Sequence, residues 1–356
     1  MIMDRVKIII NLSAIKRNIK SLQSNNPSSK IMAIMKADGY GLGSEAISRS
    51  IDDEVDYFGV ATIEEGILLR KNGIKSNILI LGYIPKDKLY NLKEYDLMAT
   101  VYSNESFYDI LQYGGKECKV HIAINTGMNR LGFRYENFNE ILEIFKYQEY
   151  LNIQGIFTHL TCADTDKEFT LTQLRRFKNL IDLLDVNNVD FGLTHAFNSA
   201  ASINTFNNYF SFDMIRVGYA LYGYSDELET PIKILSRIIQ INRVKKGESI
   251  GYGKSYVATE DKVIAVVSAG YADGFPHLLS NRGRVTVKGV SVNIVGDICM
   301  DYFMVDISDI SAKVGDEVIL FGEDINWKTF INDYKIFPYE FLCNICHRGR
   351  KLYIEN

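Results

Sequence analysis

The chain has 356 residues, of which 47% are hydrophobic, so it is long enough for a barrel-sized domain with a large core and a smaller second domain. Its formal net charge is only -4, with 40 basic and 44 acidic residues and no long block of one sign. This balance gives no indication of a nucleic-acid partner or an acidic membrane surface, and it leaves a small-molecule site as the default expectation.

The longest apolar run near the N-terminus, Ile8 to Ile10, is too short for the core of a signal peptide or for a membrane span. We therefore expect a cytoplasmic protein that does not bind membranes. The five cysteines are an odd number in a chain of this size, which fits reduced thiols better than a disulfide framework.

From residue 30 to about residue 224, apolar strands alternate with helical segments such as 62–72 and 169–184. The predicted strands are 30–37, 57–62, 77–82, 97–102, 119–125, 153–159, 191–198 and 214–223. Eight strands in alternation with helices predict an α/β fold of the (β/α)8 TIM-barrel type.

After about residue 223 the pattern changes to short β-rich runs separated by glycine-containing turns. The predicted strands of this region are 232–244, 263–269, 284–287, 292–295 and 303–307. We therefore expect a C-terminal mostly-β domain at 230–356 that follows a barrel domain at 1–229. The absence of a long linker predicts that the two domains pack closely.

Near the end of the chain, Cys343, Cys346 and His347 match the C-x-x-C-H pattern of covalent haem attachment. Haem attachment is not expected in a chain without an export signal, and two cysteines with one histidine are too few for a four-ligand zinc site. We interpret these cysteines as packing residues and predict no metal site.

One lysine, Lys36, ends the first predicted barrel strand and is followed by the glycine-rich turn of Gly39, Gly41 and Gly43. The carboxyl ends of barrel strands form the active-site face, and desolvation there lowers the pKa of a lysine, as a Schiff-base nucleophile requires. The alternative is a solvated lysine in an ordinary turn. The G-x-G-x-G spacing does not match the G-x-G-x-x-G fingerprint of dinucleotide binding.

Other polar residues also gather on the predicted barrel strands or just after them, and each alone could be a structural residue. They are Arg130 after the fifth strand, His159 at the end of the sixth, His195, Asn198 and Ser199 at the seventh, and Arg216 and Gly218 at the eighth. Together they predict a pocket for an anion and a cofactor. A helix start at Ser199 and backbone N–H groups near Gly218 suit a phosphate, and a lysine beside a phosphate site suggests pyridoxal phosphate.

Ordered motifs along nearly the whole chain resemble the alanine racemase family of fold type III pyridoxal-phosphate enzymes. They are MKADGYG at 35–41, NTGMNRLG at 125–132, HAFNSAA at 195–201, RVG at 216–218, GYG at 251–253, GYADGFP at 270–276 and VGDICMD at 295–301. The implied reaction is the interconversion of L- and D-alanine, which supplies D-alanine for peptidoglycan.

The resemblance implies that Lys36 carries the cofactor and acts as one base, while Tyr252 acts as the second base from the opposite face of the substrate. Inversion needs two groups that flank the α-carbon. His159, backed by Arg216, resembles the family's partners that favour the tyrosine phenolate. Arg216 also resembles the residue that faces the ring nitrogen, where an arginine keeps its proton and weakens the electron sink.

The resemblance also implies the remaining site residues. Arg130 and the backbone of Met300 contact the substrate carboxylate; the phosphate ligands are Tyr40, Ser199, Gly218 and Tyr219; the supporting residues are Asn125, His195, Asn198 and Asp301. In the family, the β domain that carries Tyr252, Met300 and Asp301 reaches the barrel of a partner chain. We therefore expect a homodimer with active sites shared between the chains.

This sequence departs from the family pattern at Ala123 and Asn125, where many relatives have a carbamylated lysine and an aspartate that hold the arginine matched by Arg130. Alanine cannot be carbamylated, and Asn125 is neutral. On the premise that Arg130 is buried, we predict a chloride ion beside it, because an unpaired buried charge is costly. His347 stands at a variable position and receives no role.

Two alternative functions remain open from the sequence. Serine is the nearest alternative substrate, because an apolar pocket that tolerates a hydroxyl changes selectivity by only about 10²-fold. A decarboxylase or aldolase on the same barrel would not require Tyr252 as a second base. A non-catalytic pyridoxal-phosphate carrier resembles the barrel alone, whereas this chain has over a hundred further residues.

Overall fold

The computed structural model describes residues 5–116, 118–323, 325–345 and 348–356. The chain divides into two compact units. The barrel unit consists of Lys16–Gly39 and Ser44–Leu228, and the β unit consists of the segment that ends at Ile15, Tyr40–Gly43 and Glu229–Asn356. Two residues of the C-x-x-C-H pattern, Cys346 and His347, lie outside the described residues.

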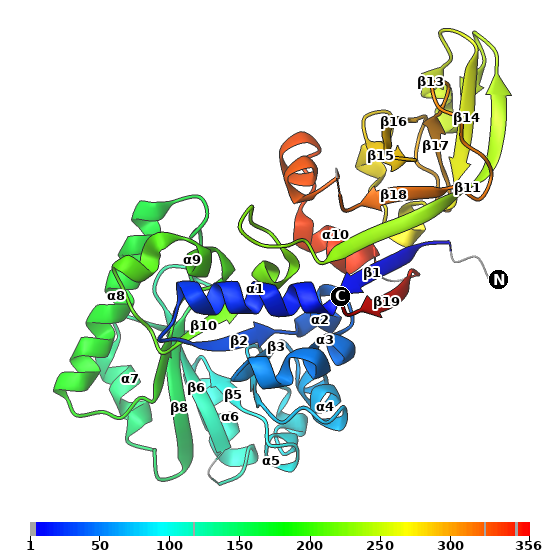
Figure 1. The fold of residues 1–356 in the computed structure, drawn as a ribbon. Helices are drawn as coiled ribbons and strands as arrows, with labels where there is room; N and C mark the ends of the chain where they lie inside the picture. Colours follow the sequence, from blue (N-terminus) through cyan, green and yellow to red (C-terminus); the bar gives the residue numbers. More distant parts are fainter. Residues whose placement is uncertain (1–4, 117, 324, 346–347) are drawn as a thin grey trace. The chain divides into compact units, whose positions relative to one another are not determined.

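Parallel strands form the centre of the barrel unit (Figure 1). They are β2 (Lys30–Ile34), β3 (Tyr57–Val60), β4 (Asn77–Ile80), β5 (Ala99–Val101), β6 (Cys118–Asn125), β8 (Leu151–Thr158), β9 (Leu193–His195) and β10 (Met214–Val217), with the short β7 (Phe133–Arg134) beside β6. β10-β2-β3-β4 and β5-β6-β8-β9 are hydrogen-bonded sheets. A parallel bridge between Leu79 and Met98 joins β4 to the start of β5, and the Arg216 N–H donates to the Phe197 carbonyl at 2.9 Å after β9. All the predicted barrel strands are confirmed.

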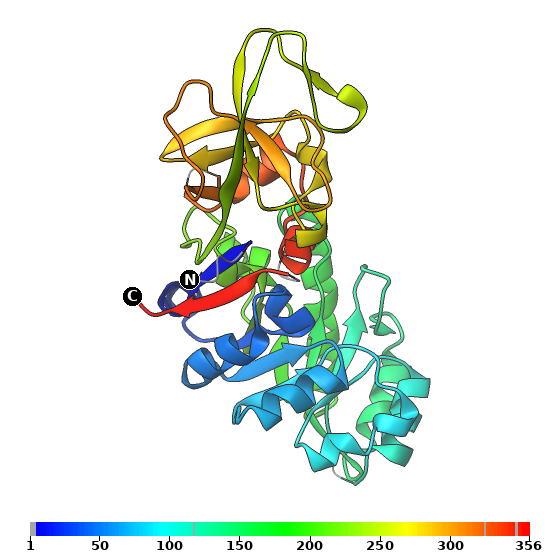
Figure 2. The ribbon, with the colours of Figure 1, turned by 90° about the vertical axis from the view of Figure 1, so that its right-hand side faces the viewer.

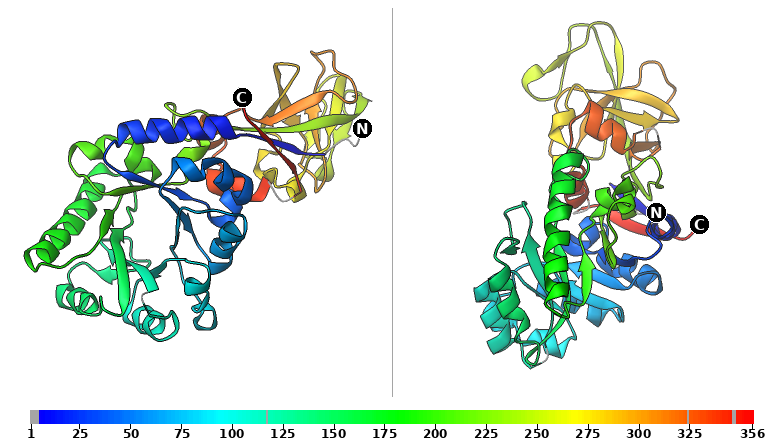
Figure 3. Two further views of the ribbon diagram at one scale, coloured as in Figure 1. Left: turned by 60° about the horizontal axis from the view of Figure 1, so that its bottom comes forward. Right: turned by 90° about the vertical axis from the view of Figure 1, so that its left-hand side faces the viewer.

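Helices lie outside the ring of strands, as the left panel of Figure 3 shows. They are α3 (Ser44–Ile51), α4 (Ile63–Lys71), α5 (Asn91–Glu94), α6 (Asn104–Tyr113), α7 (Phe138–Phe145), α8 (Lys167–Val186) and α9 (Ser199–Ile203). α1 (Leu12–Asn25) and the turn α2 (Lys36–Tyr40) each contain a boundary between the units. Every residue of β3, β5 and β10 is buried, as expected of barrel strands with the interior on one side and helices on the other.

The β unit is built on one antiparallel sheet with a parallel edge pair (Figure 2). Its strands are β1 (Lys7–Asn11), β11 (Ile232–Val244), β14 (Lys262–Val267), β15 (Arg284–Val287), β16 (Val290–Val295), β17 (Phe303–Asp306), β18 (Glu317–Phe321) and β19 (Arg350–Ile354); β12 (Ser249–Ile250) and β13 (Tyr256–Val257) form a separate hairpin, and α10 (Pro338–Ile345) precedes β19. The long β11 pairs with β1, β14 and β18, so it organises the unit.

The first strand of the chain belongs to the β unit, which differs from the predicted assignment of 1–229 to the barrel. β1 pairs antiparallel with β11 and parallel with β19, with Ile8 opposite Ile234 and Lys351. Its alternating burial places Ile8 and Ile10 in the core of this unit. The other boundary lies between Leu228 and Glu229, one residue from the predicted position.

Three predicted barrel strands, β2, β9 and β10, end three or more residues earlier than expected, and β9 stops at His195. β2 stops at Ile34, because the chain turns left-handed after Lys36, and β10 stops at Val217, because a 3-10 turn follows at Tyr219–Tyr222. These departures lie at the face where the site residues gather. Across the described ranges, no helix has the length and apolarity that a membrane span requires.

We predict that Ile8→Ala lowers the free energy of unfolding by about 2–4 kcal/mol, because Ile8 is fully buried in the β unit and the truncation leaves a cavity. Ile9→Ala is the matched control, since Ile9 is the neighbouring residue of the same strand and is only partly buried. Urea denaturation of both variants measures the difference. Equal losses in the two variants would contradict the placement of Ile8 in this core.

Candidate active site

The lysine predicted as the cofactor anchor begins a left-handed turn at the carboxyl end of β2. Ala37, Asp38 and Gly39 have φ and ψ near 52° and 48°, 54° and 46°, and 63° and 43°. Left-handed geometry costs about 1–2 kcal/mol for each residue with a Cβ, so other contacts must hold the turn. Asp38 Oδ1 accepts from the N–H of Ser44 at 2.8 Å and from its hydroxyl at 3.1 Å. The turn places Lys36 two residues after the end of β2, as predicted, but the side chain is exposed in the chain and is not desolvated as expected.

Glu65 fastens the residue that follows this lysine. Its Oε1 accepts from the Ala37 N–H at 2.7 Å, and its Oε2 accepts from the Ala61 N–H at 2.8 Å. The same residue completes the capping box of α4 with Thr62. Glu65 was not among the predicted site residues; its T-x-x-E spacing indicates the helix cap but not the bond to the lysine turn.

The predicted phosphate ligands Ser199 and Gly218 lie together in the barrel unit. Ser199 Oγ accepts from the backbone N–H of Gly218 at 3.1 Å and of Ala220 at 3.2 Å. Asn198 caps α9, since its Oδ1 accepts from the Ala201 N–H at 3.1 Å. The Ser199 hydroxyl and the backbone amides of Gly218 and Ala220 therefore meet where α9 begins. Tyr219, which stands between Gly218 and Ala220 in the sequence, is buried.

Tyr40 belongs to the β unit, where its ring packs against Tyr339 of α10 at a centroid distance of 5.7 Å. Burial, followed by the nearby Tyr339 and Cys343, raises the pKa of the Tyr40 phenol above its ordinary range. Tyr40 therefore stays protonated at neutral pH and can donate a hydrogen bond, as a phosphate ligand must.

Arg216 on β10 is the buried cation of the site. Its Nη1 donates to His195 Nδ1 at 2.9 Å, and its Nη2 donates to the Thr158 carbonyl at 2.7 Å and to His159 Nδ1 at 3.2 Å. The guanidinium also lies 5.3 Å from the centre of the Phe157 ring. Burial lowers the pKa of Arg216 to about 9, so the side chain remains charged at neutral pH. Within the described residues, these polar contacts use Nη1 and Nη2 and not Nε.

His159 contacts one cation, Arg216, and is influenced by two others. Burial and then the charges of Arg216, Arg130 and Lys36 lower the pKa of His159 below its ordinary value, so the imidazole is neutral. Because Arg216 can only donate, His159 Nδ1 is the acceptor and Nε2 carries the proton. The same reasoning assigns Nδ1 of His195 as an acceptor. Three cations near one neutral imidazole suit a ligand that carries negative charge.

Asn125 builds the turn that carries Arg130 and is not directed at the guanidinium. Its Oδ1 accepts from the backbone N–H groups of Gly127 and Asn129, each at 3.0 Å, and its Nδ2 donates to Asn129 Oδ1 at 3.0 Å. Arg130 itself is exposed. The premise of a buried, unpaired Arg130 in the chain is therefore wrong, and any role of Asn125 is indirect. Ala123 is buried in β6.

Tyr252 stands at the end of the hairpin of β12 and β13 in the β unit. It begins a 3-10 turn, Tyr252–Lys254, between Gly251 and Gly253, whose φ values are 75° and 62°. The positive φ of Gly251 favours glycine there, whereas the nearest atom to an added Cβ, Met304 Cε at 2.9 Å, ends a flexible side chain that could move. The Tyr252 side chain is 73% exposed in the chain, as a residue presented to another surface would be.

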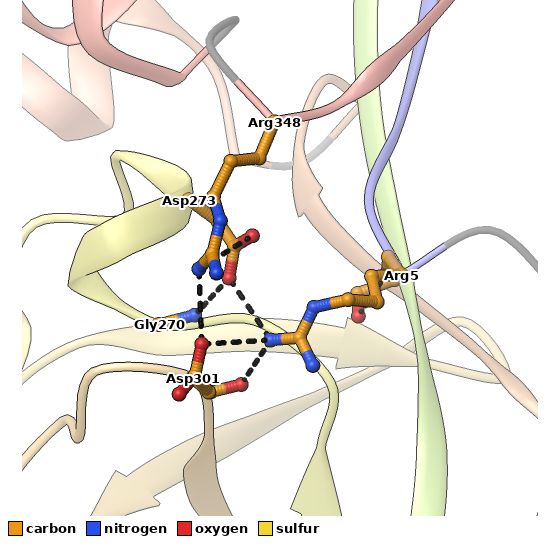
Figure 4. A network of polar contacts seen from close by, with 6 residues as sticks. Arg5, Gly270, Asp273, Asp301 and Arg348 are labelled. Atoms are coloured by element: carbon orange, nitrogen blue, oxygen red, sulfur yellow. Dashed lines mark hydrogen bonds and ion pairs between the residues drawn. The ribbon is translucent and has the colours of Figure 1, made fainter.

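A network of charges fixes the turn that contains Asp301 (Figure 4). Arg5 Nη2 donates to the Asp301 carbonyl at 2.6 Å and to Asp273 Oδ2 at 3.2 Å, and Arg348 Nη1 donates to Asp301 Oδ1 at 2.9 Å. The fully buried Asp273 also accepts from the Gly270 N–H at 3.0 Å. Two arginines and one buried carboxylate thus hold the backbone beside the predicted substrate contact.

The same turn is pinned through its backbone. The Met300 carbonyl accepts from the Ala272 N–H at 3.0 Å, and the Cys299 carbonyl accepts from the Tyr271 N–H at 3.1 Å. Met300 keeps 53% of its surface exposed. Sequence reasoning missed Arg5, which carries no local signal, although Asp273 lies in a quoted motif.

In the barrel unit, Arg216 contacts His159, while Arg130 and Lys36 are near enough for their charges to lower the pKa of His159, and Ser199 and Gly218 meet in the same unit. Tyr40, Tyr252, Met300 and Asp301 belong to the β unit. A (β/α)8 barrel with a lysine at a strand end, cationic side chains and a neutral histidine, followed by a mostly-β domain, is typical of an enzyme of the barrel class with a small-molecule site.

Comparison with known proteins identifies the family. Residues 10–226 match the family model described as "Alanine racemase, N-terminal domain", and residues 232–353 match "Alanine racemase, C-terminal domain". The chain belongs to the alanine racemase family.

Individual relatives match along nearly their whole length. Alanine racemase 1 of Caldanaerobacter subterraneus subsp. tengcongensis is 36% identical and covers 98% of this chain and 94% of its own. An alanine racemase of Desulforamulus reducens is 36% identical, with coverage of 97% and 98%. Among solved structures, this chain is similar to the alanine racemase of Clostridium difficile 630 in complex with cycloserine, with a TM-score of 0.89 and 36% identity. The match covers 100% of this chain and 97% of that chain.

We predict that the protein loses stability as the pH falls below about 6.5, the ordinary pKa of histidine. Burial and then the charge of Arg216 lower the pKa of the buried His121 to about 3 and that of His195 well below its ordinary value. Below about pH 6.5 the unfolded chain binds protons that the folded chain excludes, so the free energy of unfolding is greatest above this pH. Each histidine contributes at most about 1.4 kcal/mol per pH unit.

Urea denaturation between pH 8 and pH 5 measures this slope. His121→Asn should reduce the number of protons taken up on unfolding by about one. His277 is exposed, so His277→Asn is the control and should leave the slope unchanged. A parental slope in His121→Asn would show that His121 already binds a proton in the folded state.

Proposed function

We propose that this chain interconverts L- and D-alanine with pyridoxal phosphate and two opposed bases, in the cytoplasm, and so supplies D-alanine for peptidoglycan. The observation that carries the proposal is the neutral His159 beside Arg216, with the charges of Arg130 and Lys36 close enough to lower its pKa. Membership of the alanine racemase family and the relatives that bear this name support it.

The donor set fits pyridoxal phosphate. The Lys36 amine would hold the cofactor covalently, Ser199 with the amides near Gly218 would bind its phosphate, and Arg216 would donate to its ring nitrogen. Tyr40, whose burial keeps it protonated, would supply a further donor to the phosphate. When bound, the cofactor supplies an electron-withdrawing ring that stabilises the negative charge left by removal of the α-proton.

Arg216 would limit this electron withdrawal. Its guanidinium donates hydrogen bonds without releasing a proton, so a ring nitrogen opposite it stays unprotonated. The side chain is already held by His195, His159 and the Thr158 carbonyl, and this fixes its direction. Modest withdrawal favours return of the proton to the α-carbon over side reactions.

The two bases would be Lys36 Nζ on one face of the α-carbon and Tyr252 Oη on the other. A free phenol has a pKa near 10, so the phenolate needs stabilisation. His159 can give it, because its neutral ring carries the proton on Nε2 and can donate to a phenolate oxygen. The positive charge of Arg216 acts in the same direction.

Arg130 and the backbone of Met300 would bind the substrate carboxylate. Since Asn125 is committed to its own turn and Ala123 cannot carry a carbamate, neither compensates the Arg130 charge directly. We propose that a second copy of the chain covers Arg130 with its β unit and that an anion such as chloride lies beside the guanidinium in that assembly. The exposed Tyr252 and Met300 support a homodimer in which each β unit completes the partner's site.

We predict that Lys36→Ala abolishes racemisation in both directions and that borohydride reduction of the parent protein attaches the cofactor to Lys36. Chiral chromatography of an amino-acid panel measures the activity, and peptide mass spectrometry locates the adduct. Lys30→Ala is the matched control, since Lys30 begins the same strand and pairs with Asp56 on the surface. An adduct on another lysine would refute the assignment. Faster turnover of serine, or loss of carbon dioxide, would favour the alternative substrate or a decarboxylase.

We predict that Tyr252→Phe lowers kcat by roughly 10²–10⁴-fold, because the phenol is the acid or base on one face. Deuterium incorporation from solvent should fall most strongly for the L enantiomer, while some exchange that depends on Lys36 remains for the D enantiomer. Tyr256→Phe, on the adjacent β13, is the control and should retain activity. Equal residual exchange from both enantiomers would indicate a single base.

A further inference from the structure

Two histidines without an assigned catalytic role are connected to Arg216 by hydrogen bonds inside the barrel unit. His121 on β6 and His195 on β9 are both fully buried. His121 Nδ1 lies 2.8 Å from His195 Nε2, and His195 Nδ1 lies 2.9 Å from Arg216 Nη1. Three strands therefore contribute one continuous hydrogen-bonded chain to the barrel interior.

The chemistry of Arg216 fixes the position of each proton in this chain. A guanidinium has donors only, so His195 Nδ1 accepts. A neutral His195 then carries its proton on Nε2 and donates to His121 Nδ1, and His121 carries its own proton on Nε2. Burial and Arg216 lower the pKa values of both imidazoles, which supports their neutral state. All the hydrogen bonds run in one direction, away from the cation.

The surrounding residues leave the two rings little freedom. A Cβ at Gly155 would lie 2.5 Å from His121 Nδ1, so the glycine provides the space for this ring. Tyr57 meets His121 edge-on at 6.0 Å, and Phe157 stacks on His195 at 4.7 Å with an interplanar angle of 13°. The barrel interior is thus shaped to hold both imidazoles in one orientation.

Packing alone does not explain His121. Within the described residues its Nε2 has no hydrogen-bond partner, so the side chain buries a polar group at a cost that an apolar residue of similar size would avoid. The gain lies at Nδ1, which accepts from His195. If His121 offered no acceptor, the Nε2 proton of His195 would have no hydrogen-bond partner in this chain of contacts. The other tautomer of His195, with its proton on Nδ1, would place an N–H against the Arg216 guanidinium.

We propose that His121 is a positioning residue, which fixes the tautomer of His195 and thereby the direction of the Arg216 guanidinium. It touches neither substrate nor cofactor and acts through two intervening side chains. The inference rests on the proposed function, because the direction of Arg216 affects the reaction only if Arg216 faces the cofactor ring.

The tautomers can be measured directly in the holoenzyme and again without cofactor. The chain has five histidines, so 15N-histidine labelling gives a tractable spectrum, and single substitutions assign the signals. We expect His195 and His121 to be neutral with the proton on Nε2 in both states of the protein. A proton on Nδ1 of His195, or an imidazolium at either residue, would overturn the proposal whatever the activity is.

Two substitutions at His121 separate positioning from packing. His121→Phe keeps a ring but removes the acceptor, and we expect kcat to fall roughly tenfold with KM for alanine nearly unchanged. His121→Asn places an amide oxygen near the position of Nδ1, and it should restore most of kcat and the Nε2 proton of His195. Tyr57→Phe changes the packing against His121 without removing the acceptor, and it should behave as the parent.

The outcomes distinguish this inference from the proposed function. A parent protein that does not racemise alanine refutes the function, whereas the NMR result still decides the tautomers. A parent that racemises alanine, together with unchanged kcat in His121→Phe, refutes the positioning role alone. If His121→Phe does not fold, the His121→Asn variant and the tautomers of the parent protein decide the question. A large fall of kcat in His121→Asn, although His195 still carries its proton on Nε2, would contradict the positioning role of His121.

Discussion

The buried charge of Arg216 is the constraint on which the rest of the barrel site depends. A guanidinium inside the barrel must find acceptors for its N–H groups, and it finds them in His195, His159 and the Thr158 carbonyl. Each histidine that accepts from it is obliged to be neutral and to present its other nitrogen as a donor. The fixed charge of Arg216 therefore keeps His159 and His195 neutral. None of the Arg216 contacts named here is with a carboxylate.

The lysine turn and the Asp301 turn show the same principle in the backbone. Each holds a conformation or a charge that is unfavourable alone, and each is stabilised by residues distant in sequence. Glu65 accepts from the amide after Lys36, and Arg5 with Arg348 compensates the buried Asp273. The parts of the site that contact ligands in the proposal are thus held from outside by residues that do not contact them.

The barrel strands could be predicted from the sequence because parallel strands are buried on both faces and form continuous apolar runs between helices. The place of Lys36 just after the first barrel strand and of Arg216 on the last one followed from the same pattern. The left-handed turn was not predictable, because Ala37 and Asp38 carry no signal for that conformation. The pairing of Arg5 with Asp273, 268 positions apart, could not be predicted either. Arg5 precedes β1, whose sequence is an ordinary short apolar run with no signal for a distant partner.

The pairing of β1 with β19 has a consequence for how the protein is made. The β unit contains both the first and the last described strands of the chain, and β1 lies between β11 and β19 in its sheet. During synthesis the barrel segments leave the ribosome before β11 and β19 have been made. β1 therefore remains unpaired while the barrel segments emerge. The unit that carries Tyr252 can close only after β19 has been synthesised, so the residue proposed as the second base reaches its final setting later than the barrel residues that it would work with.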